Sequence, residues 1–502
     1  MQSFKVILAI LLFCPMFSYS QVQIGSDIDG ESIFDQSGWA VASSTDGNRV
    51  AIGAPSNSGV NGTNSGHARI YENQNGSWIQ LGNDIDGDSP NDFLGTSVAL
   101  SADANIVAVG ASYKTVGGVG YAGQVKVFQY QTGNWSQIGS DILGGPLSEQ
   151  AGYRVALSGQ GDIIAVASPS YHLPNQTAAR GRIRVYQNQM GAWVQLGGDI
   201  IGDGATDLFG RGLDISFDGS ILAVGGPSAV TGTSPEGYVK IYKFESGSWQ
   251  QIGNTLEGDP GSSGFGYAVS LSSDGNTVVS GSSTENDING VNTGVVKVYE
   301  NQSGVWIQKG NSIFGNQANT SFSQSLSIAA NGNVISIAAK GQSNGGTNGS
   351  GVVRFYGYQA GVWSQLGADI FGEAALDQSG YSEAISGDGT KVVIGSKDNN
   401  GNGAASGHVR IYDMSAFVTV TNNINESTVD KWSFYPNPAS DLVHIEFTAD
   451  ELPRRIAIYD QLGRFVRYEL NTTFSVKDLK PGFYILQIEN NMRISKKKLI
   501  VR

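Results

Sequence analysis

The amino-acid sequence predicts an all-β protein: a seven-bladed β-propeller closed by its N-terminal strand, followed by a small immunoglobulin-like β-sandwich. The strongest indication is a repeat, because tryptophan recurs at positions 78, 135, 193, 249, 306 and 363, with spacings of 57, 58, 56, 57 and 57 residues. A fixed period of this kind indicates a repeat architecture. Composition agrees, since 69 glycines and only 15% charged residues are typical of turn-rich β structure.

Residues 1–20 have the pattern of a secretory signal peptide. An apolar run extends from Val6 to Phe13, and small residues precede a cleavage point before Gln21. The run is much shorter than the ~20 residues of a membrane-spanning helix, and the bulky Phe13 disfavours lipid attachment at Cys14. Because Cys14 is the single cysteine, the mature chain is expected to contain no disulfide. Because the one apolar run is short and lies in the signal peptide, the mature chain is also expected to contain no transmembrane segment.

The propeller is expected to span residues 21–414, and each of its repeats reads as four short strands. Two apolar strands are joined by an Asp-Gly or similar pair, such as Asp46-Gly47, which accepts the positive φ angles of a two-residue hairpin turn. A long polar loop leads to a third strand with the pattern G-x-V-[KR]-[VI]-[YF], and the tryptophan strand ends the unit. The turn between the two apolar strands occurs seven times, whereas the segment that contains the repeated tryptophan occurs six times.

The two ends of the repeat region complement each other. Residues 21–30, QVQIGSDIDG, match this tryptophan segment with Gln21 in the tryptophan position, and the last repeat ends with a third strand at 407–414. The first strand is therefore predicted to complete the last sheet and to close a ring without exposed edges. A linear β-solenoid is the alternative, although it has no need for complementary ends.

The repeats resemble the FG-GAP family, which forms the blades of integrin α-subunit propellers and their bacterial relatives. The matching segments include FLGTSVALSADANIVAVGAS at residues 93–112 and FGYAVSLSSDGNTVVSGS at residues 265–282. The resemblance implies a propeller. In the integrin type, a calcium-binding loop joins the first two strands, but that junction is a tight turn in this sequence, so those calcium sites do not carry over.

The candidate ligand-binding residues enter the innermost strands, on the face that carries the long and variable loops. Variable loops on a rigid scaffold are where binding usually occurs. In each repeat one residue directly follows the Phe-Gly pair, or its equivalent, that precedes the first strand. These residues are Trp39, Thr96, Tyr153, Arg211, Tyr267, Gln324 and Tyr381. Of these we select Trp39, Tyr153, Arg211, Tyr267 and Tyr381, because aromatic rings stack on sugars and arginine binds hydroxyl groups. The alternative is that they pack between adjacent blades.

Acidic loops that enter the first two blades are the candidate calcium sites. Their carboxylates recur at positions 1, 3, 5 and 9 of each loop, a spacing that resembles an oxygen-ligand calcium loop. The glycine stands at position 4 of the second loop, however, and later repeats lose acids. The alternative is that the carboxylates cap turns or pair with lysine and arginine. The eight residues are Asp27, Asp29, Glu31, Asp35, Asp84, Asp86, Asp88 and Asp92.

Two further sets of polar residues hold matching places in the third strands. A basic residue occurs there in every repeat, and we expect it to pair or stack with the neighbouring outer strand. His67 and His408 also match, but alternation along strands of neighbouring blades would hold the two imidazoles ~10 Å or more apart, which disfavours a shared metal site.

Function is less well indicated than fold. No Ser/His/Asp order, phosphate-binding glycine loop or CxxC occurs in the sequence, and without the last seventy residues the mature chain holds 19 basic and 36 acidic residues. Nucleic acid is therefore not an expected partner. We expect a non-enzymatic surface or secreted protein that binds a glycan or a protein. The alternative is a carbohydrate-active enzyme that uses carboxylates of the same face.

A different module follows the polar linker expected at residues 415–431. Residues 432–502 resemble the C-terminal sorting domain of type IX secretion substrates in Bacteroidetes. The resemblance rests on IYDQLG and LKPGFYIL, which contain Gly463 and Gly482, on the terminal lysines, and on the first motif, which comprises Tyr435, Pro436, Asn437, Pro438 and Asp441. It implies that the type IX translocon is a partner and that the protein reaches the outer-membrane surface or the medium. Cleavage of the domain and replacement by a glycolipid would be compatible with this route.

Overall fold

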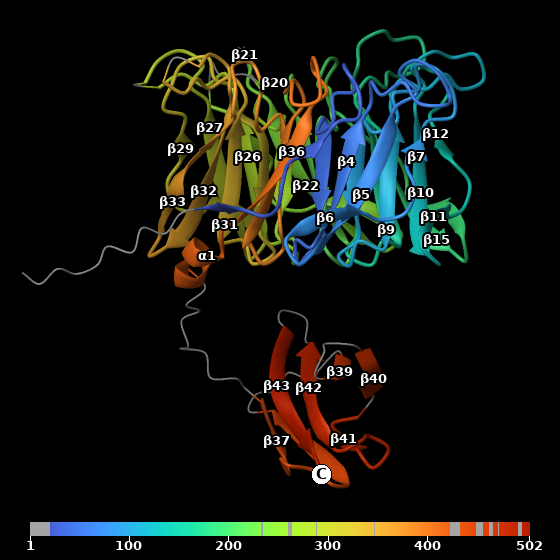
Figure 1. The fold of residues 1–502 in the computed structure, drawn as a ribbon, viewed down its shortest axis with the longest axis vertical. Coiled ribbons are helices and arrows are strands. Elements are labelled where there is room, and N and C mark those ends of the chain that lie inside the picture. Colours follow the sequence, from blue (N-terminus) through green and yellow to red (C-terminus); the bar gives the residue numbers. More distant parts are fainter. Residues whose placement is uncertain are drawn as a thin grey trace, which may run out of the picture. The chain divides into compact units, whose positions relative to one another are not determined.

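The computed structural model describes residues 21–231, 234–259, 264–287, 289–345, 347–421, 432–447, 455–460, 465–469, 471–489 and 494–502. The chain divides into two compact units, Met1–Thr421 and Asn422–Arg502, which are described separately (Figure 1). The signal peptide expected over residues 1–20 and Gly463 of the sorting motif lie outside the described residues.

The first unit consists of seven antiparallel sheets, which are the blades. Blade 1 contains β3 (Ala40–Ser43), β4 (Arg49–Ala54), β5 (His67–Gln74), β6 (Ser77–Gln80) and β7 (Ile85–Asp86). Blade 2 contains β8 (Ser97–Leu100), β9 (Ile106–Ala111), β10 (Gln124–Gln131), β11 (Asn134–Gln137) and β12 (Ile142–Leu143). Blade 3 contains β13 (Arg154–Leu157), β14 (Ile163–Ser168), β15 (Arg182–Gln189), β16 (Ala192–Gln195) and β17 (Ile200–Ile201).

The remaining four blades repeat this order. Blade 4 contains β18 (Gly212–Ile215), β19 (Ile221–Gly226), β22 (Tyr238–Glu245), β23 (Ser248–Gln251) and β24 (Leu256–Glu257), with the hairpin of β20 (Val230–Thr231) and β21 (Ser234–Pro235) in its long loop. Blade 5 contains β25 (Val269–Leu271), β26 (Thr277–Ser282), β27 (Val295–Gln302), β28 (Val305–Gln308) and β29 (Ile313–Phe314). Blade 6 contains β30 (Phe322–Ile328), β31 (Val334–Ala339), β32 (Val352–Gln359) and β33 (Val362–Phe371). Blade 7 contains β34 (Ser382–Ile385), β35 (Lys391–Ser396), β36 (His408–Asp413), β1 (Val22–Gln23) and β2 (Ile28–Asp29).

The N-terminal strand closes the ring, as the sequence predicts. Val22 pairs with Asp413, and Ile28 pairs with Val409, so β1 and β2 form the outer edge of blade 7. The innermost strands β3, β8, β13, β18, β25, β30 and β34 each contact those of both neighbouring blades, including β3 with β34. The junction between blade 7 and blade 1, here called the seam, is thus held by a segment distant in sequence from the rest of its sheet.

Apolar side chains fill the space between blades because both faces of each sheet are covered. Val125 and Val127 of blade 2, for example, pack with Ile164 and Val166 of blade 3, and all four are at most 2% exposed. Blades also approach closely at a glycine before each third strand. A side chain at Gly66, whose φ is 72°, would lie 2.2 Å from the carbonyl oxygen of Leu94, which only glycine permits.

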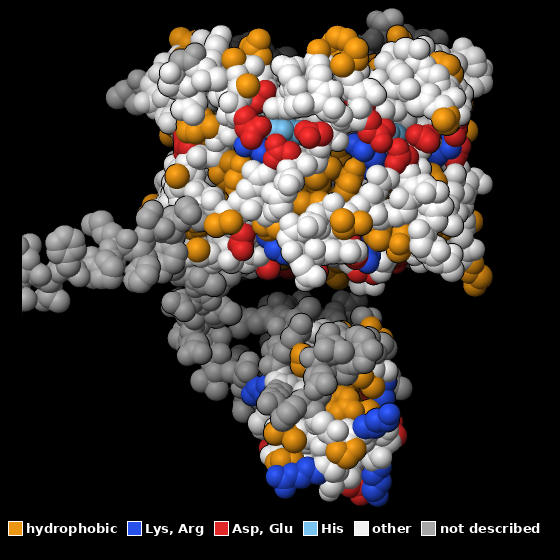
Figure 2. Space-filling view, in the orientation of Figure 1, with side chains coloured by type: hydrophobic (Ala, Val, Ile, Leu, Met, Phe, Trp, Pro, Cys, Tyr) orange, Lys and Arg blue, Asp and Glu red, His pale blue; other side chains and the backbone are white. Residues whose placement is uncertain are grey.

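Ion pairs form a belt around the flank of the propeller, visible as red and blue side chains in Figure 2. The basic residue of each third strand contacts an acidic residue of the segment that enters its blade. The pairs are Arg69–Glu31, Lys126–Asp88, Arg184–Glu149, Lys240–Asp203, Lys297–Asp259 and Arg410–Glu373. Blade 6 differs, because Arg354 pairs with Asp369 of its own sheet at 2.7 Å. The basic residues thus form the ion pairs that we expected. In six blades, however, the acidic partner lies in the segment after the neighbouring outer strand and not in that strand itself.

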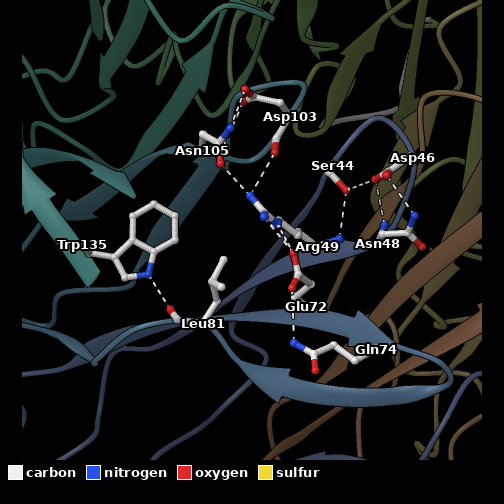
Figure 3. A network of polar contacts seen from close by, with 10 residues as sticks. All are labelled: Ser44, Asp46, Asn48, Arg49, Glu72, Gln74, Leu81, Asp103, Asn105 and Trp135. Atoms are coloured by element: carbon white, nitrogen blue, oxygen red, sulfur yellow. Dashed lines mark hydrogen bonds and ion pairs between the residues drawn. The ribbon is translucent and has the colours of Figure 1, made fainter. Parts of the chain in front are cut away.

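Tryptophans of the outer strands join neighbouring blades. The indole nitrogen of Trp135 donates a hydrogen bond of 2.6 Å to the carbonyl oxygen of Leu81 in blade 1 (Figure 3). The other five make the same contact with the preceding blade: Trp78 with Ile24, Trp193 with Ile138, Trp249 with Leu196, Trp306 with Ile252 and Trp363 with Lys309. Gln21, in the tryptophan position of blade 7, donates instead to the carbonyl oxygen of Ala368.

The turns between the first two strands are longer than the two-residue hairpins that we predicted. In blade 1 the backbone nitrogen of Ser44 bonds the carbonyl oxygen of Arg49, which leaves four residues in the loop. Gly47 alone of the Asp-Gly pair has a positive φ. Asp46 caps the turn instead, because its carboxylate accepts hydrogen bonds from the hydroxyl of Ser44 and the backbone of Asn48 (Figure 3).

The propeller unit ends with a helix rather than with a polar linker directly after β36. Helix α1 (Ser415–Thr421) occupies the first part of the expected linker and contacts β32 and β33. Val418 is fully buried with Met414 in the core between blades 6 and 7. The remainder of the linker, residues 422–431, lies outside the described residues.

The second unit is a β-sandwich. One sheet contains β37 (Trp432–Tyr435), β38 (Leu442–Phe447) and β41 (Thr473–Ser475), and the other contains β40 (Phe465–Glu469), β39 (Arg455–Asp460), β42 (Gly482–Glu489) and β43 (Ile494–Val501). Their apolar faces form one core, in which Val443 and Phe474 of the first sheet pack with Ile458 and Leu486 of the second.

Candidate functional site: the axial mouth of the propeller

The residues that enter the innermost strands lie around the propeller axis and enclose a small cavity. Six of the seven residues in the predicted register line it: Trp39, Thr96, Tyr153, Tyr267, Gln324 and Tyr381. Arg211 lines an adjoining cavity that shares Arg154 and Tyr267 with the first. The volumes are about 60 and 120 Å³, whereas clefts that enclose a small molecule have roughly 300–1,000 Å³. This arrangement, here called the axial mouth, therefore suits contact with part of a ligand.

Side chains of the axial mouth contact each other across blade boundaries. The guanidinium of Arg211 donates a hydrogen bond to the hydroxyl of Tyr153 and lies 4.6 Å from the centroid of its ring. The ring centroids of Trp39 and Tyr381 lie 5.0 Å apart across the seam. All of these side chains are nevertheless partly exposed. Packing between blades and a surface open to solvent therefore coexist at these positions.

Three cations of the axial mouth were not selected from the sequence. Arg154 follows Tyr153 and lies 5.8 Å from the centroid of its ring. The ammonium groups of Lys340 and Lys397 lie 5.0 and 4.8 Å from the ring centroid of Tyr381. Both lysines directly follow the second strand of their blades, β31 and β35. Comparing that register position among the repeats, as we did for the residue after the FG glycine, would have found them.

Positive charge gathers at Tyr267. Burial opposes ionisation of its phenol, but Arg154, Arg211 and Lys340 outweigh burial and lower the pKa of Tyr267. Within the described part of the chain, none of these three cations forms an ion pair with a carboxylate, whereas Lys397 contacts Asp398 at 2.7 Å. An unpaired group of cations in a protein of net charge −13 favours an anionic ligand at this position.

Glu383 is the single carboxylic acid among the described residues that line the two axial cavities. It is 6% exposed and accepts hydrogen bonds from the hydroxyls of Ser327 and Ser336. Burial raises the pKa of Glu383 to about 7, although these two hydrogen bonds oppose the rise. Glycoside hydrolysis commonly uses two carboxyl groups, and the described lining of the two cavities contains one, that of Glu383.

The carboxylates of the two acidic loops contact several separate partners. In the second loop, Asp88 and Asp92 both pair with Lys114, at 3.6 and 2.6 Å, and Asp92 also accepts a hydrogen bond from the backbone of Ser89. Asp35 caps the equivalent turn of the first loop at Ser32. These contacts are of the kind expected from the alternative interpretation, in which the carboxylates cap turns or pair with lysine and arginine. The calcium sites remain a prediction.

The other acids of these loops lie nearer the third strands. Asp27 and Asp84 each accept a hydrogen bond from a glutamine, Gln23 and Gln80, at 2.6 Å. The pKa values of Asp29 and Asp86 are raised, mainly by burial and also by the neighbouring Asp27 and Asp84. Glu31 belongs to the ion-pair belt through Arg69.

The predicted sorting motif lies along the last strand of the β-sandwich. The side-chain oxygen of Asn437 accepts a hydrogen bond from the backbone of Ile500, and Ala439 bonds the carbonyl oxygen of the same residue. Asp441 pairs with Lys477 at 2.9 Å, and Tyr435 is 47% exposed. The peptide bonds before Pro436 and Pro438 are cis, and Gly482 begins β42.

Comparison with solved structures finds propeller-like neighbours at low sequence identity. A putative 6-phosphogluconolactonase from Bacteroides uniformis is 14% identical, with a TM-score of 0.45, over 67% of this chain and 86% of that one. U3-55K is 13% identical, with a TM-score of 0.49, over 77% of this chain and 98% of that one. The first neighbour contradicts our expectation that the protein is not an enzyme, and we withdraw that expectation. Its low similarity assigns no reaction to this chain.

Comparison with protein families identifies the C-terminal unit. A search of curated proteins found no match, and no FG-GAP family model matches the repeats. No helix among the described residues is long and apolar enough to cross a membrane. Residues 433–502 match the family described as secretion system C-terminal sorting domain. This part of the chain is therefore a sorting domain, which indicates type IX secretion and export to the cell surface or the extracellular space.

Proposed function

We propose that the propeller is an extracellular binding module whose axial mouth recognises an acidic glycan, a saccharide that carries carboxylate or sulfate groups. The sorting domain delivers the module outside the cell, and the blades, which we propose to be related to FG-GAP repeats, present the site. The observation that carries the proposal is the position of Tyr267 among three cations that have no carboxylate partner within the described residues.

Each part of the axial mouth has a role in this binding. The guanidinium groups of Arg154 and Arg211 supply charge-assisted hydrogen bonds to an acidic group. The rings of Trp39 and Tyr381 supply a flat apolar surface for a sugar face. The cavity of about 60 Å³ has room for a few water molecules, so a polymer would lie across the mouth with one substituent directed inward.

The test is binding of the purified protein to an array of neutral and acidic polysaccharides. Arg211→Gln is the informative variant, because blade 6 already has a glutamine, Gln324, at the equivalent position. Loss of a hydrogen bond to a charged group costs about 1.5–3 kcal/mol, so we expect affinity for the acidic glycan to fall roughly 10- to 100-fold. Lys243→Gln is the matched control, since Lys243 pairs with Glu245 on the outer surface.

Two results would contradict the proposal: binding confined to neutral glycans, or an affinity for acidic glycans that Arg211→Gln leaves unchanged. Each sample is also assayed for shortening of the polysaccharide, because turnover would show that the axial mouth belongs to an enzyme rather than to a binding module.

A further inference from the structure

Two equivalent groups of side chains lie on the flank of the propeller, away from the axial mouth. Each contains a histidine at the start of a third strand and two carboxylates. One group consists of Glu31, His67 and Asp84, and the other of Asp27, Glu373 and His408. Within each group, one candidate ligand atom from each residue lies within 4.8 Å of the other two. The pale blue histidine surfaces among the red side chains in Figure 2 show where such groups lie on the visible flank.

The distances match those between ligands of one metal ion. The Nδ1 atom of His67 lies 3.5 Å from Asp84 and 4.0 Å from Glu31. The Nδ1 atom of His408 lies 3.3 Å from Asp27 and 4.0 Å from Glu373. Ligand atoms at ~2.1 Å from a tetrahedral zinc ion are separated by roughly 3.4 Å. Small side-chain movements would therefore complete the coordination.

Each carboxylate presents one oxygen to the histidine because its other oxygen is already held. Gln80 donates to Oδ1 of Asp84, and Oδ2 faces His67. Arg69 contacts Oε1 of Glu31, and Oε2 faces the same imidazole. In blade 7 the equivalent residues Gln23 and Arg410 hold Asp27 and Glu373 in the same way. Such outer contacts orient ligands in metal sites.

His408 is a buried polar side chain without a hydrogen bond. It is 1% exposed, and neither of its ring nitrogens has a hydrogen-bond partner among the described residues. A buried imidazole nitrogen without a hydrogen-bond partner is available to bind a metal ion.

Blades 2 and 3 show what else can fill this place. Arg182 of blade 3, at the position of the histidine, contacts Asp199, which is equivalent to Asp84, and Glu149 of the segment that enters the blade. Gln124 of blade 2 donates to Asp141 at 2.5 Å. Blade 3 thus places a side-chain cation between its carboxylates, whereas blades 1 and 7 place a histidine there.

We propose that His67 and His408 each bind a divalent transition-metal ion, for which zinc fits the one-imidazole, two-carboxylate set, at two sites that flank the seam. A fourth position at each site is left for water or a second carboxylate oxygen. Asp27 lies in the N-terminal segment that completes blade 7, and Glu31 follows that segment directly. The two ions would therefore fasten that segment to the third strands of blades 7 and 1.

The test measures metal bound to the full mature chain by equilibrium dialysis against zinc, with cobalt absorption spectra as a second readout. We expect two zinc ions per chain. His67→Gln and His408→Gln should each lose one ion, and the double variant should lose both. Glutamine is the residue of blade 2 at this position, so the variants are expected to fold. His172→Gln is the control, because His172 belongs to neither group, and it should keep both ions.

Thermal unfolding gives an independent measurement. Zinc should raise the melting temperature of the wild type and should leave that of the double variant unchanged, because an ion that binds only the folded state stabilises it. The proposal is wrong if the wild type binds no zinc, or if the double variant retains it. Calcium binding that survives both substitutions, without zinc binding, would likewise overturn it and would favour the acidic loops as the site.

Discussion

Substitution of Ile28 tests whether the N-terminal strand holds the ring together. Ile28 is 6% exposed and packs at the seam with Val50 and Ile52 of blade 1 and with Val393 and Val409 of blade 7. Isoleucine-to-alanine substitutions in a core cost about 2–5 kcal/mol. Because Ile28 contacts both blades, we expect Ile28→Ala to lower the free energy of unfolding by about 3 kcal/mol, near the middle of that range.

The expected change in melting temperature follows from the size of the unit. At ~2.1 cal/mol/K per residue, a propeller of roughly 390 residues has an unfolding entropy of about 0.8 kcal/mol/K, so 3 kcal/mol corresponds to about 4 °C. Differential scanning calorimetry or circular dichroism would measure this shift. Ile85→Ala is the matched comparison, because Ile85 has the same position in blade 1 and is 3% exposed. Val22→Ala, at a side chain that is 59% exposed, should change stability by less than about 0.5 kcal/mol.

A wild-type melting temperature for Ile28→Ala, together with a lowered one for Ile85→Ala, would refute this reasoning. Such a result would mean that the N-terminal segment does not contribute to the seam in solution. The ring would then be open, and blade 7 would lack its outer strand.

Two other predictions concern pH and export. The pKa of Glu383 is raised from 4.5 to about 7 by burial. The contribution of this carboxyl group to the free energy of unfolding is therefore fully present below pH 4.5, its pKa in the unfolded chain, and is lost as the pH rises through about 7. Glu383→Gln should therefore unfold at a temperature that depends less on pH over this interval, and equal dependence in both proteins would contradict the assignment. Deletion of residues 433–502 should leave a folded propeller inside the cell envelope, because the sorting domain is lost; immunoblots that find it in the medium at normal levels would disprove this role.

The sequence was sufficient to predict the blades and their closure because each repeat carries its own pattern. Gln21 could be placed in the tryptophan position from sequence alone, and the structure puts it in blade 7. The predicted type of the turn at Asp46 was wrong, because an Asp-Gly pair suits both a two-residue hairpin and a longer turn in which aspartate caps the backbone. Helix α1 was not predicted because its seven residues are too few to show a recognisable helical periodicity of apolar residues.

The candidate site was predicted only in part, for a physical reason. The register of Tyr153 and Tyr267 is periodic in sequence, so its convergence on the axis follows from the ring. The group around His67 depends instead on how one blade's entry segment lies against the next blade, and this is set by interblade packing. From the sequence we considered the two histidines as one pair, whereas in the structure each lies beside its own two carboxylates.

The two histidines lie beside the outer segment of blade 7, which pairs with β36 over only two residues in each of β1 and β2. Within each of the other blades the outer strand has its tryptophan, and those tryptophans bond the preceding blade. In blade 7 that strand consists of two-residue pieces, β1 and β2, with Gln21 in place of tryptophan. Gln21 contacts Ala368 of blade 6, so the junction of blades 6 and 7 lacks an indole, whereas Trp78 bonds Ile24 across the seam. Histidine occurs at the start of the third strand only in the blades on the two sides of the seam, since the other blades have Gln124, Arg182, Tyr238, Val295 and Val352 there. Coordination at these two positions would attach this outer segment to the third strands of blades 7 and 1, in addition to the bond from the indole of Trp78.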